Sequence, residues 1–333
     1  MDLDWKNLSF GYIKTDYNIR SYFRDGAWTT PELTTDETVT MHMAATCLHY
    51  GQEAFEGQKA FCGADGVIRI FRPEENAKRM RSSAEYLKMA LPPVDMFVDM
   101  MKRVVKANER FVPPYASLYI RPVLFGTGPQ VGVKPAGEYL LIVFVTPVGP
   151  YYKEGFNPIK VLIDRDHDRA APLGTGHVKA GGNYAASLTS AEIGHEKGYP
   201  SVLYLDAKEK KHIDECGAAN FFGIRDGVYI TPKSHSVLPS ITNMSLMTLA
   251  AEMGLKVEQR PVDYDELGTF DEAGSCGTAA VLSPIGSIYD PQTGHTFVYN
   301  DGKPGKWSEK LYHRLRAIQY AEEPDTYGWM AAL

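Results

Sequence analysis

The sequence has few cysteines and no long apolar run. Its four cysteines, Cys47, Cys62, Cys216 and Cys276, are scattered among 333 residues, and no two of them form a CxxC pair. This spacing favours reduced thiols over a disulfide framework or a zinc site. No stretch approaches the roughly 18 consecutive apolar residues of a membrane-spanning helix. We therefore expect neither disulfides nor a membrane segment.

An excess of positive charge is also missing. The chain has 35 lysines and arginines against 41 acidic residues, a formal net charge of −6. This balance argues against a general affinity for nucleic acid or for anionic membranes. The first ten residues, MDLDWKNLSF, are acidic and polar where a secretory signal would be basic and then apolar. We expect a cytoplasmic protein with neither nucleic acid nor membrane as a partner.

Several common catalytic motifs are absent. The sequence has no HExxH and no paired Cys/His spacing, and its nine histidines are dispersed. Residues 273–277 read AGSCG, one glycine short of the GxSxG motif around a catalytic serine. We therefore expect no metal site and no serine hydrolase.

The spacing of apolar residues predicts both helices and strands. Residues 94–110 keep the i, i+3, i+4 spacing of an amphipathic helix, and prolines bound an earlier helix at 74–91. Further helices are predicted at 184–197, 246–253 and 307–318. Strands are predicted at 20–28, 67–71, 117–125, 139–146, 159–164, 201–206, 219–224, 227–231 and 256–262, followed by a loop-strand piece at 274–288. Because this order lacks a regular βαβ spacing, it predicts the α+β class rather than a doubly wound sheet.

A domain boundary is predicted near residue 150. Pro147, Gly149 and Pro150 begin a turn-rich stretch, and residues 165–176 are charged and irregular. We predict an N-terminal domain over residues 1–150 and a C-terminal domain over residues 151–333, with a mobile connecting loop at about 165–176.

One lysine lies in a run of glycines. Residues 174–184 read GTGHVKAGGNY, with Lys179 at the centre. Lysine can condense with an aldehyde, and flanking glycines let the backbone and a cofactor approach it closely. The spacing fits neither a GxxxxGK[ST] P-loop nor a dinucleotide-binding GxGxxG, whose third glycine is replaced by Lys179. For this stretch alone, a solvated loop lysine is the alternative interpretation.

Three further segments extend this pattern. They are Ile213–Asn220 (IDECGAAN), Leu238–Thr242 (LPSIT) and Gly274–Ala279 (GSCGTA). The first places an acidic residue before an apolar strand, the second opens a helix whose free N–H groups suit a phosphate, and the third can turn amides toward an anion. Each segment alone is commonly structural: a charged turn, an N-cap or a tight turn. Together, and in this order, they predict a pyridoxal phosphate site.

Motifs spread along nearly the whole chain resemble one family. They are Phe10-Gly11, His49-Tyr50, residues 55–61 (FEGQKAF), Phe71-Arg72-Pro73, Arg79-Met80, residues 117–123 (SLYIRPV), residues 179–184 (KAGGNY) and residues 277–279 (GTA). The chain thereby resembles the branched-chain amino acid aminotransferases, fold-type IV enzymes that use pyridoxal phosphate. Shorter relatives, the D-amino acid transaminases and aminodeoxychorismate lyases, usually lack the FEGxKAF and LYxRPV segments. The resemblance implies a small N-terminal α/β domain and a larger C-terminal mixed-sheet domain, joined by an interdomain loop.

The resemblance implies roles at the cofactor. Lys179 is expected to bond to the cofactor aldehyde and later to move a proton between the substrate Cα and the cofactor, which requires a neutral amine. Glu215 is expected to keep the pyridine nitrogen protonated. The other implied contacts are Tyr184 to the phenolic oxygen, and Arg79, Ile241, Thr242 and Thr278 to the phosphate.

The resemblance also implies a substrate pocket that accepts an aliphatic side chain in one half-reaction and a glutamate carboxylate in the other. Its implied aromatic walls are Phe10, Tyr50, Phe55 and Tyr119. Arg121 is expected to bind the second carboxylate of glutamate, and Thr278 and Ala279 are expected to bind the α-carboxylate. The loop Thr127–Val133, with Val131 and Val133, is expected to reach the partner subunit's site, so we expect a homodimer. Plain core packing is the alternative for the aromatic walls.

The leading hypothesis is transamination of leucine, isoleucine or valine with 2-oxoglutarate, which yields branched-chain 2-oxo acids and L-glutamate. One alternative is another fold-type IV transaminase, acting on D-amino acids or other hydrophobic amines. A non-catalytic binder of phosphate ligands is a second, although such a protein needs neither Lys179 nor Glu215. Ala218 and Cys276 depart from residues of some family members, which leaves the substrate contacts there open. The CxxC motif of mammalian relatives has no counterpart after Ala279, so we expect no thiol switch of that kind.

Overall fold

The computed structural model describes residues 3–5, 8, 10–149 and 156–333. The chain forms two compact units. Unit 1 consists of Met1–Tyr151, Val178–Gly181 and Ala317–Leu333, and unit 2 of Tyr152–His177 and Gly182–Arg316. Two segments beyond residue 150 thus group with the N-terminal part of the chain. None of the helices in the described ranges is long and apolar enough to cross a membrane.

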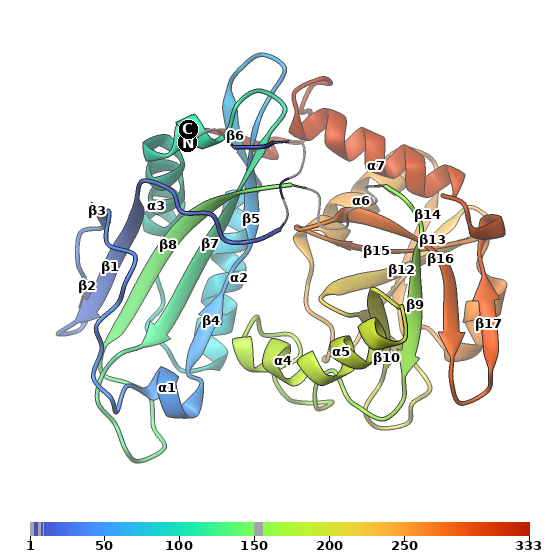
Figure 1. Ribbon diagram of the computed structural model, residues 1–333, viewed down its shortest axis with the longest axis horizontal. Helices are drawn as coiled ribbons and strands as arrows, with labels where there is room; N and C mark the ends of the chain where they lie inside the picture. The colour runs from blue at the N-terminus through green and yellow to red at the C-terminus, as the bar shows by residue number, and fades with distance from the viewer. Residues whose placement is uncertain (1–2, 6–7, 9, 150–155) are drawn as a thin grey trace. The chain divides into compact units, whose positions relative to one another are not determined.

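Unit 1 is built on an antiparallel sheet. Its strand order is β18-β6-β5-β7-β8-β1-β2, with β3 beside β1 and β4 beside β7 (Figure 1). The strands are β1 (Asn18–Arg24), β2 (Ala27–Trp28), β3 (Glu32–Thr34), β4 (Glu53–Phe55), β5 (Gln58–Cys62), β6 (Ile68–Phe71), β7 (Ser117–Gly126), β8 (Tyr139–Val148) and β18 (Met330–Ala332). The last strand explains why the C-terminus belongs to unit 1, because β18 pairs with β6.

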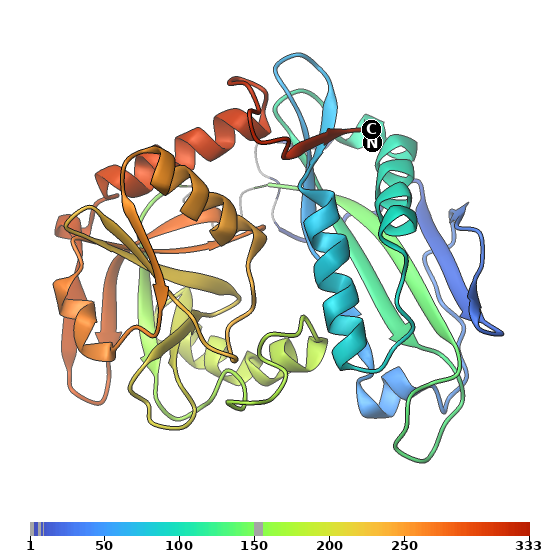
Figure 2. The same cartoon turned by 180° about the vertical axis from the view of Figure 1, so that it is seen from behind.

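Helices α2 (Pro73–Tyr86) and α3 (Val94–Ala107) cover one face of this sheet (Figure 2). Successive side chains of a strand point to opposite faces. On β7, Leu118 and Ile120 are therefore buried in the same core as Phe97 of α3, whereas Tyr119 and Arg121 lie on the opposite face. The side chains of Tyr119 and Arg121 are thus directed away from the core by strand geometry.

Unit 2 contains a sheet of mixed direction. Its order is β11-β10-β9-β16-β15-β12-β13-β14, with β17 beside β16, and a further pairing of β11 with β12 closes part of it into a barrel. The strands are β9 (Ile159–Asp164), β10 (Ser201–Leu205), β11 (Ile213–Cys216), β12 (Ala219–Arg225), β13 (Val228–Pro232), β14 (Lys256–Arg260), β15 (Glu272–Gly277), β16 (Val281–Asp290) and β17 (His295–Val298). Strand β9 is parallel to β10 and β16. Val161, Leu203, Phe221 and Ile285 belong to its core.

The remaining elements are helices and short 3-10 turns. They are α1 (Thr46–Tyr50), α4 (Gly181–Ala186), α5 (Leu188–Glu196), α6 (Ile241–Glu252), α7 (Lys306–Gln319), η1 (Glu109–Phe111), η2 (Tyr264–Thr269) and η3 (Asn300–Gly302). All four cysteines are free thiols. The mixture of antiparallel and mixed sheets with interspersed helices confirms the predicted α+β class.

Four predicted helices differ in extent from the observed ones by more than one residue. Helix α3 ends at Ala107 rather than 110, and α6 begins at Ile241 rather than 246. The helix predicted at 74–91 ends at Tyr86, because Lys88 adopts the left-handed conformation, with φ of 56°. The helix predicted at 184–197 is divided into α4 and α5 at Ser187. There the Ser187 hydroxyl donates to the Tyr184 carbonyl at 2.8 Å, a local bond that competes with regular helix bonding.

Candidate active site

Unit 1 holds Lys179 by its backbone. The Lys179 N–H donates to Ser83 Oγ of α2 at 3.1 Å, and its carbonyl accepts from the Phe55 N–H of β4 at 3.0 Å. Two residues on, the Gly181 N–H donates to the Glu53 carboxylate. A Cβ at Gly181 would collide with that carboxylate, so a close approach explains this glycine. The half-buried lysine is therefore anchored to both a strand and a helix.

A buried ion pair lies in the same unit. Arg79 donates from Nε to Glu56 Oε1 at 2.7 Å and from Nη2 to Oε2 at 2.8 Å. Asn76 Nδ2 adds a bond to Oε2 at 2.8 Å, and Glu56 is completely buried. Burial alone would raise the pKa of Glu56, but Arg79, Lys179 and Asn76 hold this pKa below its ordinary value. The bidentate pair fixes the plane of the Arg79 guanidinium.

These surroundings make Lys179 an unusually weak base. Burial, together with the positive charge of Arg79, lowers the pKa of Lys179 to about 8, although Glu56 opposes the shift. With a pKa of about 8, roughly one lysine in ten is neutral at pH 7, against fewer than about one in a thousand for an ordinary lysine. A neutral amine is the form that attacks a carbonyl or accepts a proton.

An aromatic and cationic group surrounds Arg121. Its guanidinium lies 4.8 Å from the Phe55 ring centre and 5.2 Å from that of Tyr119, and Nη2 donates to the Tyr119 hydroxyl at 3.0 Å. Phe10 packs edge-on against Tyr119, with ring centres 5.0 Å apart. Arg121 Nε is buried and meets no acceptor among the described residues. The structure therefore brings together Phe10, Phe55, Tyr119 and Arg121.

The other predicted pocket residues of unit 1 lie at a loop. The Tyr50 hydroxyl, at the end of α1, donates to the Val131 carbonyl. Val131 and Val133 are 80% and 85% exposed. Tyr50 therefore contacts the 127–133 loop.

Unit 2 holds Glu215 in a buried ion pair. Arg169 Nε lies 2.5 Å from Glu215 Oε2, and the Leu238 N–H donates to Oε1 at 2.5 Å. Arg169 Nη1 also donates to the carbonyls of Gly176 and Ser236, each at 2.9 Å. Glu215 is 2% exposed. Its carboxylate is thus kept in one orientation by contacts from both sides.

Helix α6 begins at Ile241 and Thr242, as the LPSIT segment predicts. Ser240 is the N-cap, and its hydroxyl accepts from the Asn243 N–H at 3.2 Å. Asn243 is tied to the sheet, because it accepts from the buried Tyr229 hydroxyl at 2.7 Å and donates to Thr231 Oγ1 at 3.0 Å. This bonding fixes the first turn of a helix, whose backbone N–H groups attract anions.

The remaining predicted residues of unit 2 lie in a turn and a short helix. Thr278 and Ala279 form the turn between β15 and β16, and both are partly exposed. The next residue but one, Val281, has φ of 66°, a conformation rare for a β-branched residue. Tyr184 lies in α4. Small residues and an unusual backbone conformation therefore shape the GSCGTA segment.

Two charged residues of the site had no role assigned by sequence reasoning. Glu56 belongs to the FEGQKAF motif, but nothing local indicates that it binds Arg79. Arg169 lies in the stretch expected to be a mobile loop, yet it is buried and bonded to Glu215. For Glu56 the detectable signal was an acidic residue between the aromatic Phe55 and Gly57 of this motif. No signal in the sequence indicated Arg169.

Comparison with known proteins now assigns the family. The model of the family described as amino-transferase class IV matches residues 53–288. A branched-chain-amino-acid aminotransferase of Haemophilus influenzae is 47% identical over 339 residues, covering 99% of this chain and 98% of that protein. Another from Helicobacter pylori is 46% identical, covering 99% and 97%. The chain belongs to the class IV aminotransferase family, as its motifs predicted.

Solved structures agree with this assignment. The branched-chain amino acid aminotransferase of Escherichia coli matches with a TM-score of 0.82 and 27% identity, covering 96% of this chain and 99% of that one. The branched-chain amino acid aminotransferase of Thermobaculum terrenum, in its PLP-form, matches with a TM-score of 0.81 and 25% identity, covering 96% and 98%. The predicted fold type is thereby confirmed.

Proposed function

We propose that this protein is a pyridoxal phosphate-dependent aminotransferase that moves the amino group of leucine, isoleucine or valine to 2-oxoglutarate. The observation that carries the proposal is Lys179. In a chain of the class IV aminotransferase family, this lysine is anchored by its backbone and has a pKa of about 8. The printed names of the relatives supply the branched-chain substrate class.

The residues present fit the cofactor's chemical requirements. When bound, pyridoxal phosphate supplies an aldehyde that condenses with amines and a ring that takes up electrons released at the substrate Cα. Lys179, when neutral, would attack that aldehyde and later carry the proton to and from Cα. Glu215, paired with Arg169, would keep a proton on the ring nitrogen.

The other cofactor contacts are proposed from the anion-binding groups. The N–H groups of Ile241 and Thr242 begin α6 and would donate to phosphate oxygens. Arg79 and Thr278 would add a charged and a hydroxyl contact, and Tyr184 would donate to the phenolic oxygen. The C-terminal part of the chain, from about residue 151, would thus supply most cofactor contacts.

The substrate pocket is proposed around Arg121. Its buried Nε has no acceptor among the described residues, and a buried donor without an acceptor is costly. The second carboxylate of glutamate would satisfy it. Phe10, Tyr50, Phe55 and Tyr119 would surround an aliphatic side chain, while the amides of Thr278 and Ala279 would hold the α-carboxylate.

A homodimer in the cytoplasm is part of the proposal. Val131 and Val133 are large apolar side chains almost fully exposed on one loop, and contact with a partner subunit would bury them. We propose that this loop reaches the partner subunit's substrate site. Sedimentation of the purified protein would measure the subunit number.

The test of the proposed activity is an absorption spectrum of the purified holoenzyme. Adding L-leucine without a keto acid is expected to replace the band of the lysine-bound cofactor by the shorter-wavelength band of its amine form. Adding 2-oxoglutarate is expected to restore the first band. Both half-reactions are thereby followed on one sample.

The same experiment separates the alternatives. A cofactor band that ignores L-leucine but responds to D-alanine would favour a transaminase of D-amino acids. If no band forms even after incubation with pyridoxal phosphate, the enzyme assignment is wrong.

The rate at which cofactor-free protein bonds to pyridoxal phosphate is expected to rise with pH and to level off above about pH 8. The reason is that only neutral Lys179 attacks the aldehyde, and the pKa of Lys179 is about 8. Below this value the neutral fraction falls about tenfold for each pH unit. Stopped-flow absorbance between about pH 6 and about pH 9.5 measures the rate; a midpoint near the ordinary lysine value of about 10 would contradict the lowered pKa.

A further inference from the structure

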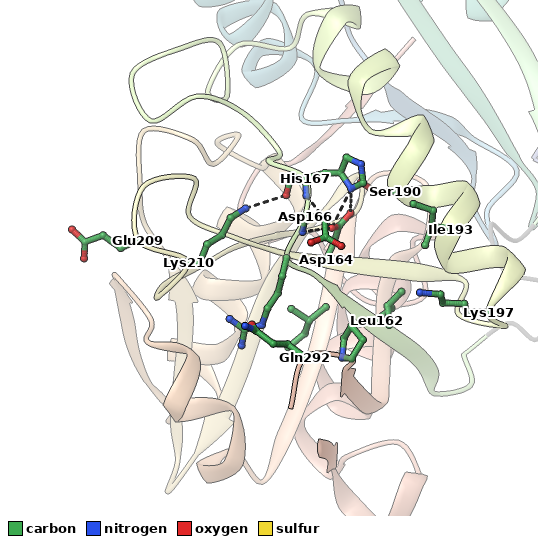
Figure 3. A pocket seen from close by; sticks show the side chains of 13 residues that line it. Leu162, Asp164, Asp166, His167, Ser190, Ile193, Lys197, Glu209, Lys210 and Gln292 are labelled. Carbon is green, nitrogen blue, oxygen red and sulfur yellow. Dashed lines mark hydrogen bonds and ion pairs between the residues drawn. The ribbon is translucent and has the colours of Figure 1, made fainter. Parts of the chain in front are cut away.

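A cavity lies in unit 2, and none of the residues proposed above for the cofactor or substrate lines it. Its volume is about 610 Å³, which is within the usual range for small-molecule sites. It is lined by the end of β9, residues 165–167, helix α5 and parts of two loops (Figure 3). All of these elements belong to unit 2.

The cavity contains a buried hydroxyl whose hydrogen bonding is incomplete. Ser190 is 1% exposed. Its hydroxyl is near enough to Asp164 and Tyr204 to influence their pKa values, but it makes no hydrogen bond of normal geometry with any described residue. Asp164 itself accepts from the N–H groups of Asp166 and His167 at 2.9 and 3.1 Å. The Tyr204 hydroxyl is likewise buried without a hydrogen bond of normal geometry to a described residue.

Helix α5 presents three kinds of group to the cavity. Ser190 and Ile193 are spaced i and i+3 and lie on one face of α5, and Lys197 is the C-cap residue directly after the end of this helix. They provide a hydroxyl, an apolar side chain and a cation. Figure 3 shows Ser190 beside the His167–Asp164 pair, with Ile193 further along the helix and Lys197 just beyond its end. Buried Leu162 adds a second apolar surface.

The charges around the cavity balance. Three acidic residues (Asp164, Asp166 and Glu209) line it with three cationic ones (Arg165, Lys197 and Lys210). Arg165 and Lys210 are paired with Asp290 and Asp168, whereas Asp166 and Lys197 have no ion pair within the described ranges. A balanced lining favours a ligand without net charge over a polyanion such as a nucleotide.

We propose that this cavity binds a zwitterionic α-amino acid with a small apolar side chain. Lys197 would receive its carboxylate, Asp166 its ammonium group, and Leu162 and Ile193 its side chain. On the proposed function, leucine and its homologues are the amino acids of this class that the protein handles, so the site would sense a substrate or product.

The cavity is connected to the proposed cofactor site through the chain. Residues 165–167 lead directly to Arg169, which holds Glu215, and α5 follows the short helix that carries Tyr184. Occupancy would therefore hold the segment before Arg169 in place. Because binding linkage is reciprocal, cofactor and amino acid would each strengthen binding of the other.

The test uses holoenzyme treated with borohydride, which fixes the cofactor on Lys179 and blocks the catalytic site. Equilibrium dialysis with radiolabelled L-leucine is expected to show one bound leucine per chain, and L-glutamate is expected to compete poorly. Lys197→Gln and Asp166→Asn are each expected to weaken leucine binding by about tenfold, because each removes one charged contact. The matched control is Lys256→Gln, an exposed lysine of β14 that pairs with Glu258, outside the cavity lining.

Three results would overturn the proposal: no bound leucine, equal binding of L-glutamate, or leucine binding that the Lys197 and Asp166 variants leave unchanged. The test does not depend on turnover. If the protein binds leucine in this way but performs no transamination with leucine, the proposed function fails and the binding site stands.

Discussion

Replacing Lys179 by alanine is expected to reduce transamination of L-leucine by roughly a thousandfold or more, because the nucleophile and the proton carrier are lost together. The band of the lysine-bound cofactor should disappear as well. The fold should persist, since Glu56 keeps its bonds to Arg79 and Asn76 and a buried amine is removed. Steady-state assays, absorbance and urea unfolding measure the three effects.

Two variants make this result specific. Lys179→Arg keeps a positive charge beside Glu56 but cannot condense with the aldehyde, so it should be as inactive as the alanine variant. Lys78→Ala removes an exposed lysine of α2 that pairs only with neighbouring Glu75 among the described residues, and it should keep full activity. Substantial turnover by Lys179→Ala would contradict the role of Lys179.

Glu215→Gln is expected to lower kcat by about a hundredfold or more while the cofactor stays bound. Glutamine cannot hold a proton on the ring nitrogen as a carboxylate does, and loss of one preorganised electrostatic group commonly costs about 10²–10³-fold. The variant should also unfold more readily, because buried Arg169 loses its charged partner. Removing one member of a buried ion pair costs up to about 3–5 kcal/mol.

A conservative replacement separates the two effects. Glu215→Asp restores the charge at a shorter reach and should recover part of both activity and stability. The matched surface control is Glu258→Gln, which disturbs only ion pairs on β14. If Glu215→Gln lost the cofactor band but kept normal turnover when cofactor was in excess, Glu215 would be a binding residue only.

Local patterns were sufficient for several elements. The apolar run at 159–164 coincides with β9, and the runs at 117–125 and 139–146 lie within one or two residues of β7 and β8. Apolar spacing located α3, which begins at Val94 as predicted. These predictions succeeded for one reason. A continuously buried strand or an amphipathic helix requires apolar residues at regular positions close together in the sequence.

Short elements were less accessible. Strands β4 and β5 carry the FEGQKAF motif, but each is brief and neither alternates clearly between apolar and polar residues. Strand β18 was missed because its pairing with β6 involves the far end of the chain. In both regions, pairing with neighbouring strands stabilises the strand, and its own composition does not indicate one.

For the site, motif and spacing named the reactive groups: Lys179 among glycines, the acidic Glu215 before a strand, and the helix start at Ile241. They could not supply the lowered pKa of Lys179 or the partners of two buried carboxylates. Glu56 meets Arg79 because the link between β4 and β5 packs against α2, and Arg169 meets Glu215 because a loop folds back onto β11. The sequence determines the type of each residue. The charges that surround a residue depend on distances between segments remote in sequence, and these distances are set only by folding.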